Sequence, residues 1–192
     1  MDSSFERECA GIRSRHAIPI RPVFVAAAVL AVMASRLLPH PPNFTPVGTS
    51  ALFGGACFGD RRAAFLLPLA SMALSDLALG FQLHALTVVV YGCFLLEVTL
   101  GLWLRPRRRP LPIAGATLLG ASLFFLITNA ACWLYFYPRT LAGMRDCYAS
   151  AIPFFGYTLL GDAFFATLLF GTLAVAEGRF PALRERAIPI LA

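Results

Sequence analysis

The sequence predicts an all-helical, polytopic membrane protein with six transmembrane segments, the second of them short, and with both termini in the cytoplasm. The first observation is composition, because 58% of the 192 residues are hydrophobic and only 14% are charged, whereas a soluble domain has ~45–50% and ~25%. The second is the presence of 17 Phe residues, which is incompatible with the aromatic-poor composition of disordered chains. The third is that the basic residues lie between apolar runs, where they set membrane topology.

Five apolar runs are long enough to cross a bilayer, which requires ~20 predominantly apolar residues, with a working range of ~17–25. They are residues 22–38, 62–80, 85–104, 111–135 and 152–176. A sixth run, residues 47–58, is short and rich in glycine, and runs of that length are more often re-entrant or interfacial. Between the last two long runs we expect an outer loop over residues 136–151, and long loops commonly carry binding residues.

The arginines decide whether the short run crosses the membrane. The chain has no Lys, and all 16 basic residues are Arg. With six crossings, 13 arginines lie on the cytoplasmic side and only Arg36, Arg139 and Arg145 lie outside, whereas without the short crossing six lie inside and ten outside. The positive-inside rule favours six crossings. The chain is thereby divided into a cytoplasmic segment 1–21, a membrane domain 22–176 and a cytoplasmic tail 177–192.

Two other interpretations of the basic residues are weaker. The N-terminal arginines, the Ala/Val-rich core and Val32-Met33-Ala34 also fit a signal peptide with its cleavage site, but the core continues to Leu38 and five further segments follow. Nucleic-acid binding is disfavoured because such proteins gather their charge on one face or helix. In this chain the arginines instead separate the apolar runs.

The sequence contains no motif for catalysis. It has no phosphate-binding loop, nucleophile elbow or His-rich metal motif, and its five cysteines show no C-x-x-C spacing. We therefore expect no enzyme activity and no bound cofactor. Cys132 and Cys147 both fall near the predicted outer face and could pair in an oxidising compartment, although a buried thiol is more often a small apolar filler.

Three carboxyl groups lie within the predicted spans, where a charge at mid-bilayer costs at least ~2.5–3.5 kcal/mol. Asp76 is near the outer edge, where a neighbouring hydroxyl and water could satisfy it, so a structural role is favoured. Glu97 shares a helix face with Cys93 and Gly101, which favours a buried polar clamp over a coupling site. Asp162 lies ~15 Å deep, and a ligand contact and a structural hydrogen bond explain it equally well.

Two further features concern helix faces. Asn129, in the outer third of the fifth span, is explained equally well by hydrogen bonding between helices and by ligand binding. Ala27 and Ala31 are small residues four apart, a spacing that marks helix contacts in lipid. Internal packing explains most such pairs, but the first helix is Ala-rich and apolar enough to present this face to another membrane protein.

Seven short motifs are spread over residues 36–176. They are Pro42-Asn43-Phe44-Thr45-Pro46, Ala51-Leu52-Phe53-Gly54-Gly55, Leu74-Ser75-Asp76-Leu77, Thr128-Asn129, Cys147-Tyr148, Ala151-Ile152-Pro153-Phe154-Phe155 and Leu159-Leu160-Gly161-Asp162. In combination they resemble an uncharacterised family of small bacterial inner-membrane proteins. That family is similar to the substrate-binding S components of energy-coupling factor (ECF) transporters, which have six helices, cytoplasmic termini and an outward pocket for vitamins or metal-related nutrients.

The resemblance implies binding and uptake of a small water-soluble nutrient, a vitamin or related compound, at the bacterial inner (cytoplasmic) membrane. S components often carry an Ala-x-x-x-Ala face on their first helix for the coupling subunit, which Ala27 and Ala31 match. Because the chain has no ATPase motif, an ATP-driven step would need partner ATPases, although some S-like proteins, including a group that handles cobalamin, occur without dedicated partners. A thiol can ligate cobalt, so Cys93 or Cys147 is a candidate ligand for that metal.

We expect the pocket to use polar side chains that orient the ligand and aromatic walls that exclude water. The polar residues are Asn43, Asp76, Asn129, Tyr148 and Asp162, and the walls are Trp133 and Phe155. The expected partners are membrane lipid, the nutrient, and the ECF coupling subunit with its ATPases. The alternative function is a membrane scaffold or assembly protein that acts through helix–helix contacts and binds no small molecule.

Overall fold

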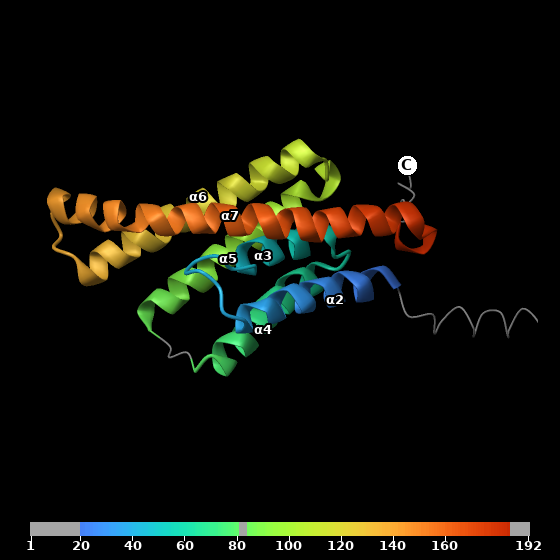
Figure 1. Cartoon of the computed structure of the whole chain (residues 1–192), viewed down its shortest axis with the longest axis horizontal. Coiled ribbons are helices and arrows are strands. Elements are labelled where there is room, and N and C mark those ends of the chain that lie inside the picture. Colours follow the sequence, from blue (N-terminus) through green and yellow to red (C-terminus); the bar gives the residue numbers. More distant parts are fainter. Residues whose placement is uncertain (1–19, 81–83, 185–192) are drawn as a thin grey trace, which may run out of the picture.

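The computed structural model of the chain describes residues 20–80 and 84–184, and within this part all regular secondary structure is helical (Figure 1). The predicted fold class is confirmed to this extent. Most of the two predicted terminal segments, residues 1–19 and 185–192, lies outside the described residues. The elements are α2 (Ile20–Ala34), η1 (Ser35–Leu37), α3 (Val47–Cys57), α4 (Arg61–Ala78), α5 (Ala85–Leu104), η2 (Arg105–Arg107), α6 (Pro110–Phe136), α7 (Leu141–Arg179) and η3 (Pro181–Leu183).

Four of the described helical segments are long and apolar enough to cross a membrane: Ile20–Leu37, Ala85–Arg107, Pro110–Phe136 and Leu141–Arg179. Helix α4 has 18 residues, but two arginines at its start and Asp76 near its end reduce its apolar character. When η1 is counted with α2, the predicted runs 22–38, 47–58, 62–80, 85–104 and 111–135 agree with the helix bounds to within about two residues. The chain therefore has the architecture of a polytopic membrane protein.

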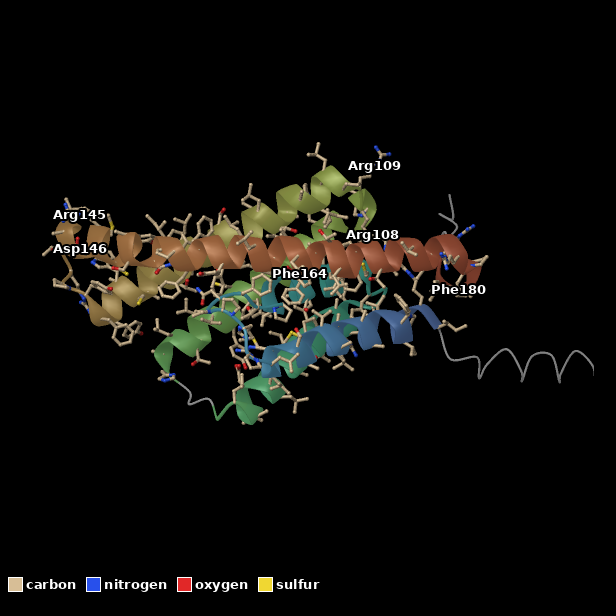
Figure 2. All side chains as sticks on the ribbon, viewed as in Figure 1. Arg108, Arg109, Arg145, Asp146, Phe164 and Phe180 are labelled. Carbon is tan, nitrogen blue, oxygen red and sulfur yellow. The ribbon has the colours of Figure 1, made fainter. Side chains whose placement is uncertain are left out.

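Successive α-helices run in alternating directions, so that α2, α4 and α6 point toward one end of the bundle and α3, α5 and α7 point back (Figure 1). Figure 2 shows Arg108 and Arg109 at one end, and Arg145 and Asp146 at the tip of the α6–α7 hairpin at the other. At the first end the Arg21 side chain of α2 pairs with Glu177 of α7 at 3.2 Å. We refer to these as the arginine end and the hairpin end.

The short helix α3 lies at the centre of the bundle. All eleven of its residues are buried, and it contacts α2, α4, α5, α6 and α7. Its closest approach is to α5, because a Cβ built on Gly101 would collide with the Leu52 carbonyl oxygen and lie 2.9 Å from Gly55 Cα. At about 16 Å in length, α3 is too short to span a bilayer alone, but its neighbours cover it on every side.

The α6–α7 hairpin differs from the sequence prediction. Instead of a loop over residues 136–151, only four residues separate the helices, and α7 is one helix of 39 residues that continues through Pro153. Thr140 caps its start by accepting a hydrogen bond from the Gly143 amide at 3.1 Å. The Trp133 indole of α6 donates to the Pro138 carbonyl at 3.0 Å and closes the turn. Helix α7 is about 58 Å long, and the hairpin projects beyond the other helices (Figure 1).

The contact between α3 and α5 predicts that Gly101→Ala lowers the thermal unfolding midpoint of the detergent-solubilised protein. The added methyl group meets main-chain atoms that cannot move aside, and overpacking of this kind costs about 1–3 kcal/mol. Gly92→Ala is the matched control on the same helix, because nothing lies within 4 Å of a Cβ at that position. Equal midpoints for the two variants would contradict the close approach of α3 to α5.

Candidate ligand-binding site

A cavity of about 240 Å³ lies between α5, α6 and α7 toward the hairpin end of the bundle. Its walls are mainly aromatic and aliphatic, with a few polar groups from α6, α7 and the loop after α2. This combination is typical of small-molecule sites, in which a few polar groups orient a ligand between apolar walls. The lining residues are Asn43, Leu86, Val89, Val90, Phe124, Phe125, Thr128, Asn129, Cys132, Ala151, Phe154, Phe155 and Thr158.

A second, smaller cavity of about 50 Å³ lies deeper in the bundle and shares Asn43, Phe124 and Thr158 with the first. We call the two the outer and inner chambers. Two buried carboxyl groups face the inner chamber, from Glu97 of α5 and Asp162 of α7. The other residues that line it are Thr45, Gly48 and Phe94.

Asn43 is positioned by a tight turn in the loop between η1 and α3. The Phe44 amide donates to the Pro41 carbonyl at 3.1 Å, and Asn43 has φ of 62°. Pro42 followed by Asn43 is the residue order that a type II turn favours, since proline fixes the first central φ and Asn tolerates the left-handed region at the second. The sequence of this loop thus places the Asn43 side chain on the wall shared by both chambers.

The Glu97 carboxyl occupies a slot between two glycines of neighbouring helices. A Cβ on Gly48 of α3 would lie 3.0 Å from Glu97 Oε1, and a Cβ on Gly120 of α6 would lie 2.8 Å from Glu97 Oε2. Any larger residue at either position would displace the carboxyl. Glu97 itself is 4% exposed, so the two glycines make room for an acidic group deep inside the bundle.

Asp162 approaches the same point from α7. Its Oδ1 accepts a hydrogen bond from the Thr49 hydroxyl of α3 at 2.8 Å and lies 3.3 Å from the position of a Gly48 Cβ. Gly161 lets α7 come close to the loop, because a Cβ there would lie 3.2 Å from Phe44 Cα. The carboxyls of Glu97 and Asp162 thus both border the space beside Gly48.

Asp76 lies outside both chambers, in an ion pair near the hairpin end. The Arg36 guanidinium of η1 donates to Asp76 Oδ1 and, at 2.7 Å, to the Ser75 hydroxyl. The Tyr91 hydroxyl of α5 donates to Asp76 Oδ2 at 2.9 Å. These contacts join η1, α4 and α5 and satisfy both carboxylate oxygens, so the arrangement around Asp76 is structural.

The remaining expected site residues are divided between the chambers and their surroundings. Asn129 and Phe155 line the outer chamber, although the Asn129 amide donates to the Phe125 carbonyl of its own helix at 2.8 Å. Tyr148 does not line either chamber, but its ring packs edge-to-face on Phe125 and its hydroxyl donates to the Leu126 carbonyl at 2.8 Å. Trp133 belongs to the hairpin turn.

Glu97 also belongs to the candidate site. The sequence favoured a buried polar clamp for this residue, and Glu97 was not among the expected ligand-binding residues.

The cysteines do not form a metal site in the described part of the chain. Within residues 20–80 and 84–184, no group of three His, Cys, Asp or Glu side chains has a metal-binding arrangement. Cys93 lies on α5, whereas the Cys147 thiol on α7 lies against Cys132 of α6 and the Asn129 carbonyl, at 3.5 Å from the latter. Both Cys132 and Cys147 are free thiols in the structure.

A larger cavity of about 650 Å³ lies between α6 and α7 nearer the arginine end. Its walls are mostly aliphatic, with Arg108, Thr117, Thr167 and Glu177 as the polar exceptions. It presents no pair of inward carboxyls and few groups that would orient a water-soluble ligand. We therefore place the candidate site in the outer and inner chambers.

Fold and cavities define a helical membrane protein with a mainly apolar pocket between its helices that carries a few polar groups. The chain belongs to a family of unknown function, DUF6580, whose model matches residues 16–183. The expectation of an uncharacterised family is thereby confirmed. None of the curated proteins and none of the solved structures that were compared matches the chain.

The Arg36–Asp76 pair predicts a non-additive effect on stability. Asp76→Asn or Arg36→Gln alone should cost about 3–5 kcal/mol, because each leaves one largely buried charge without its partner. The double variant should lose less stability than the sum of the two single losses. The unfolding midpoints of all four proteins would measure this difference. Strictly additive losses would contradict the pairing.

The contact between Cys132 and Cys147 predicts that a mild added oxidant, such as copper phenanthroline, joins α6 to α7 through a disulfide. Mass spectrometry of non-reduced peptides should detect the cross-link between these two residues. Cys57 and Cys93, which are buried on α3 and α5, serve as internal controls and should remain reduced. A cross-link between other cysteines, with none between 132 and 147, would contradict the packing of the hairpin.

Proposed function

We propose that this protein binds a small water-soluble nutrient, a vitamin or related compound, in the two chambers and carries it across a bacterial inner membrane as an S-component-like protein. The observation that carries the proposal is an outer chamber that shares wall residues with an inner chamber bordered by Asn43, Glu97 and Asp162. A purely structural bundle has no need of two buried carboxyls that face a cavity. Such groups at membrane depth are typical of substrate or ion sites.

The proposed orientation places the chambers on the outside. In this topology all six α-helices, including α3, cross the membrane and both termini are cytoplasmic. The arginine end faces the cytoplasm, as the positive-inside rule requires, and the outer chamber lies toward the opposite end. Arg36 then lies on the outer side, where its pairing with Asp76 offsets its charge.

For delivery across the membrane we propose docking of a coupling subunit on α2, with ATPases on the cytoplasmic side. Ala27 and Ala31 are both exposed on this helix, together with Val23 and Leu30. A small, apolar face permits close approach of a second helix in lipid. The same face also supports the alternative function as a scaffold, which predicts a co-purifying protein and no bound small molecule.

The proposal predicts that the gently purified protein retains a small molecule that Asn43→Gly loses. Glycine keeps the left-handed turn conformation and removes only the side-chain amide. Loss of one or two ligand hydrogen bonds should lower retention about tenfold. The measurement is mass spectrometry of compounds released from equal amounts of folded protein.

Asp146→Asn is the matched control, because this exposed polar residue of α7 does not line either chamber. It should retain the compound as the unmodified protein does. Equal retention by Asn43→Gly would contradict the assignment of the chambers. A protein partner without any released compound would favour the scaffold.

A further inference from the structure

The inner chamber contains acidic groups without a basic partner. Elsewhere in the described part of the chain the buried carboxyl of Asp76 and the half-buried one of Glu177 each pair with an arginine. Over residues 20–80 and 84–184, no ion pair reaches Glu97 or Asp162, and no hydrogen-bond donor reaches the Glu97 carboxyl. Glu97 is 4% exposed and Asp162 5%, so both carboxyls lie away from the outer surface of the bundle.

This arrangement is unfavourable for the protein alone when both groups are ionised. Each carboxylate at this depth costs several kcal/mol to desolvate, and both border the same space, since a Gly48 Cβ would lie within 3.3 Å of Glu97 Oε1 and Asp162 Oδ1. Two like charges that close also repel each other. A cation held between them would offset both costs.

Two hydroxyl groups close to the carboxyls also suit a hydrogen-bond donor. The Thr158 hydroxyl uses its proton in a bond to the Phe154 carbonyl at 3.1 Å, so it presents lone pairs to the chamber. Beside the chamber, the Thr49 hydroxyl likewise donates to Asp162. The Asn43 amide and the Thr45 hydroxyl, which also line the chamber, can donate as well as accept. An ammonium or amidinium group has only donors and no acceptor, which suits the two carboxyls and the Thr158 oxygen.

The size and walls of the two chambers indicate an organic cation. The inner chamber, about 50 Å³, accommodates a compact charged head, while the outer chamber of about 240 Å³ accommodates a larger body. Phe94 and Phe124 stack at 5.6 Å between ring centroids and both line the inner chamber. Aromatic rings stabilise nearby cations, and a bare metal ion would leave the outer chamber unused.

We propose that the ligand of this site carries a cationic nitrogen, a protonated amine or an amidinium, which sits between Glu97 and Asp162 with the rest of the molecule in the outer chamber. The inference rests on the proposed function and specifies its substrate class. It also implies that compounds with a carboxylate at the inserted end are rejected, because the two acidic groups would repel them.

The test uses the whole protein in lipid nanodiscs and three probes that differ only at one end: benzylamine, benzyl alcohol and benzoate. Benzylamine should raise the thermal unfolding midpoint, and the other two should leave it unchanged. In Glu97→Gln, which is nearly isosteric, the benzylamine concentration for half-maximal stabilisation should rise about tenfold or more. Asp146→Asn is the control and should respond as the unmodified protein does.

If Glu97→Gln does not fold, Asp162→Asn is measured in its place. The comparison of the three probes on the unmodified protein also tests the cationic assignment without any variant. Equal stabilisation by benzylamine and benzyl alcohol would overturn the inference. A second result would also overturn the inference. Sodium chloride alone, added to a potassium buffer, would stabilise the unmodified protein as much as benzylamine does, and this effect would be lost in Glu97→Gln. The site would then hold an alkali ion.

The charge of the compound released from purified protein separates this inference from the proposed function. A compound with a basic nitrogen supports both. A neutral or acidic compound overturns the cationic assignment and leaves nutrient binding intact. Absence of any compound, together with no response to the probes, overturns both.

Discussion

The close packing of α3 against α5 is the constraint on which the rest of the structure depends. Because Gly55 and Gly101 bring the two backbones together, an eleven-residue helix is enclosed by its neighbours. Its burial in turn places Gly48 and Thr49 beside the carboxyls of α5 and α7. Small residues at a helix interface permit this approach, since dispersion contacts and not water exclusion hold helices together in lipid.

The acidic residues within the bundle fall into two kinds with different physical roles. Asp76 is neutralised by Arg36 and accepts a hydrogen bond from the Tyr91 hydroxyl, and the resulting network ties η1, α4 and α5 together. Glu97 and Asp162 have no such cation in the described residues, and glycines rather than arginines surround them. A carboxyl that is provided with space but not with a counter-charge is poised to interact with a group that enters the cavity.

The single helix α7 connects these features. It supplies Asp162 and Thr158 to the inner chamber, Phe154 and Phe155 to the outer chamber, and Cys147 to the contact with α6. All of these groups therefore lie along one continuous helix. The sequence suggested a loop over residues 136–151 because Pro138, two arginines and Asp146 interrupt the apolar pattern, but helix geometry tolerates charged residues where the hairpin projects beyond the bundle.

The sequence by itself determined the helical membrane fold and most helix bounds, because apolar length and the placement of arginine are local properties of the chain. It also singled out Asn43, Asn129, Phe155 and Asp162, which line the two chambers, since polar groups and turn residues within apolar runs are conspicuous. Only the tertiary structure separated Asp76 from this set and added Glu97. The reason is that the role of a buried carboxyl depends on which cation lies across from it. Arg36 is forty residues from Asp76, and the glycines beside Glu97 come from two other helices.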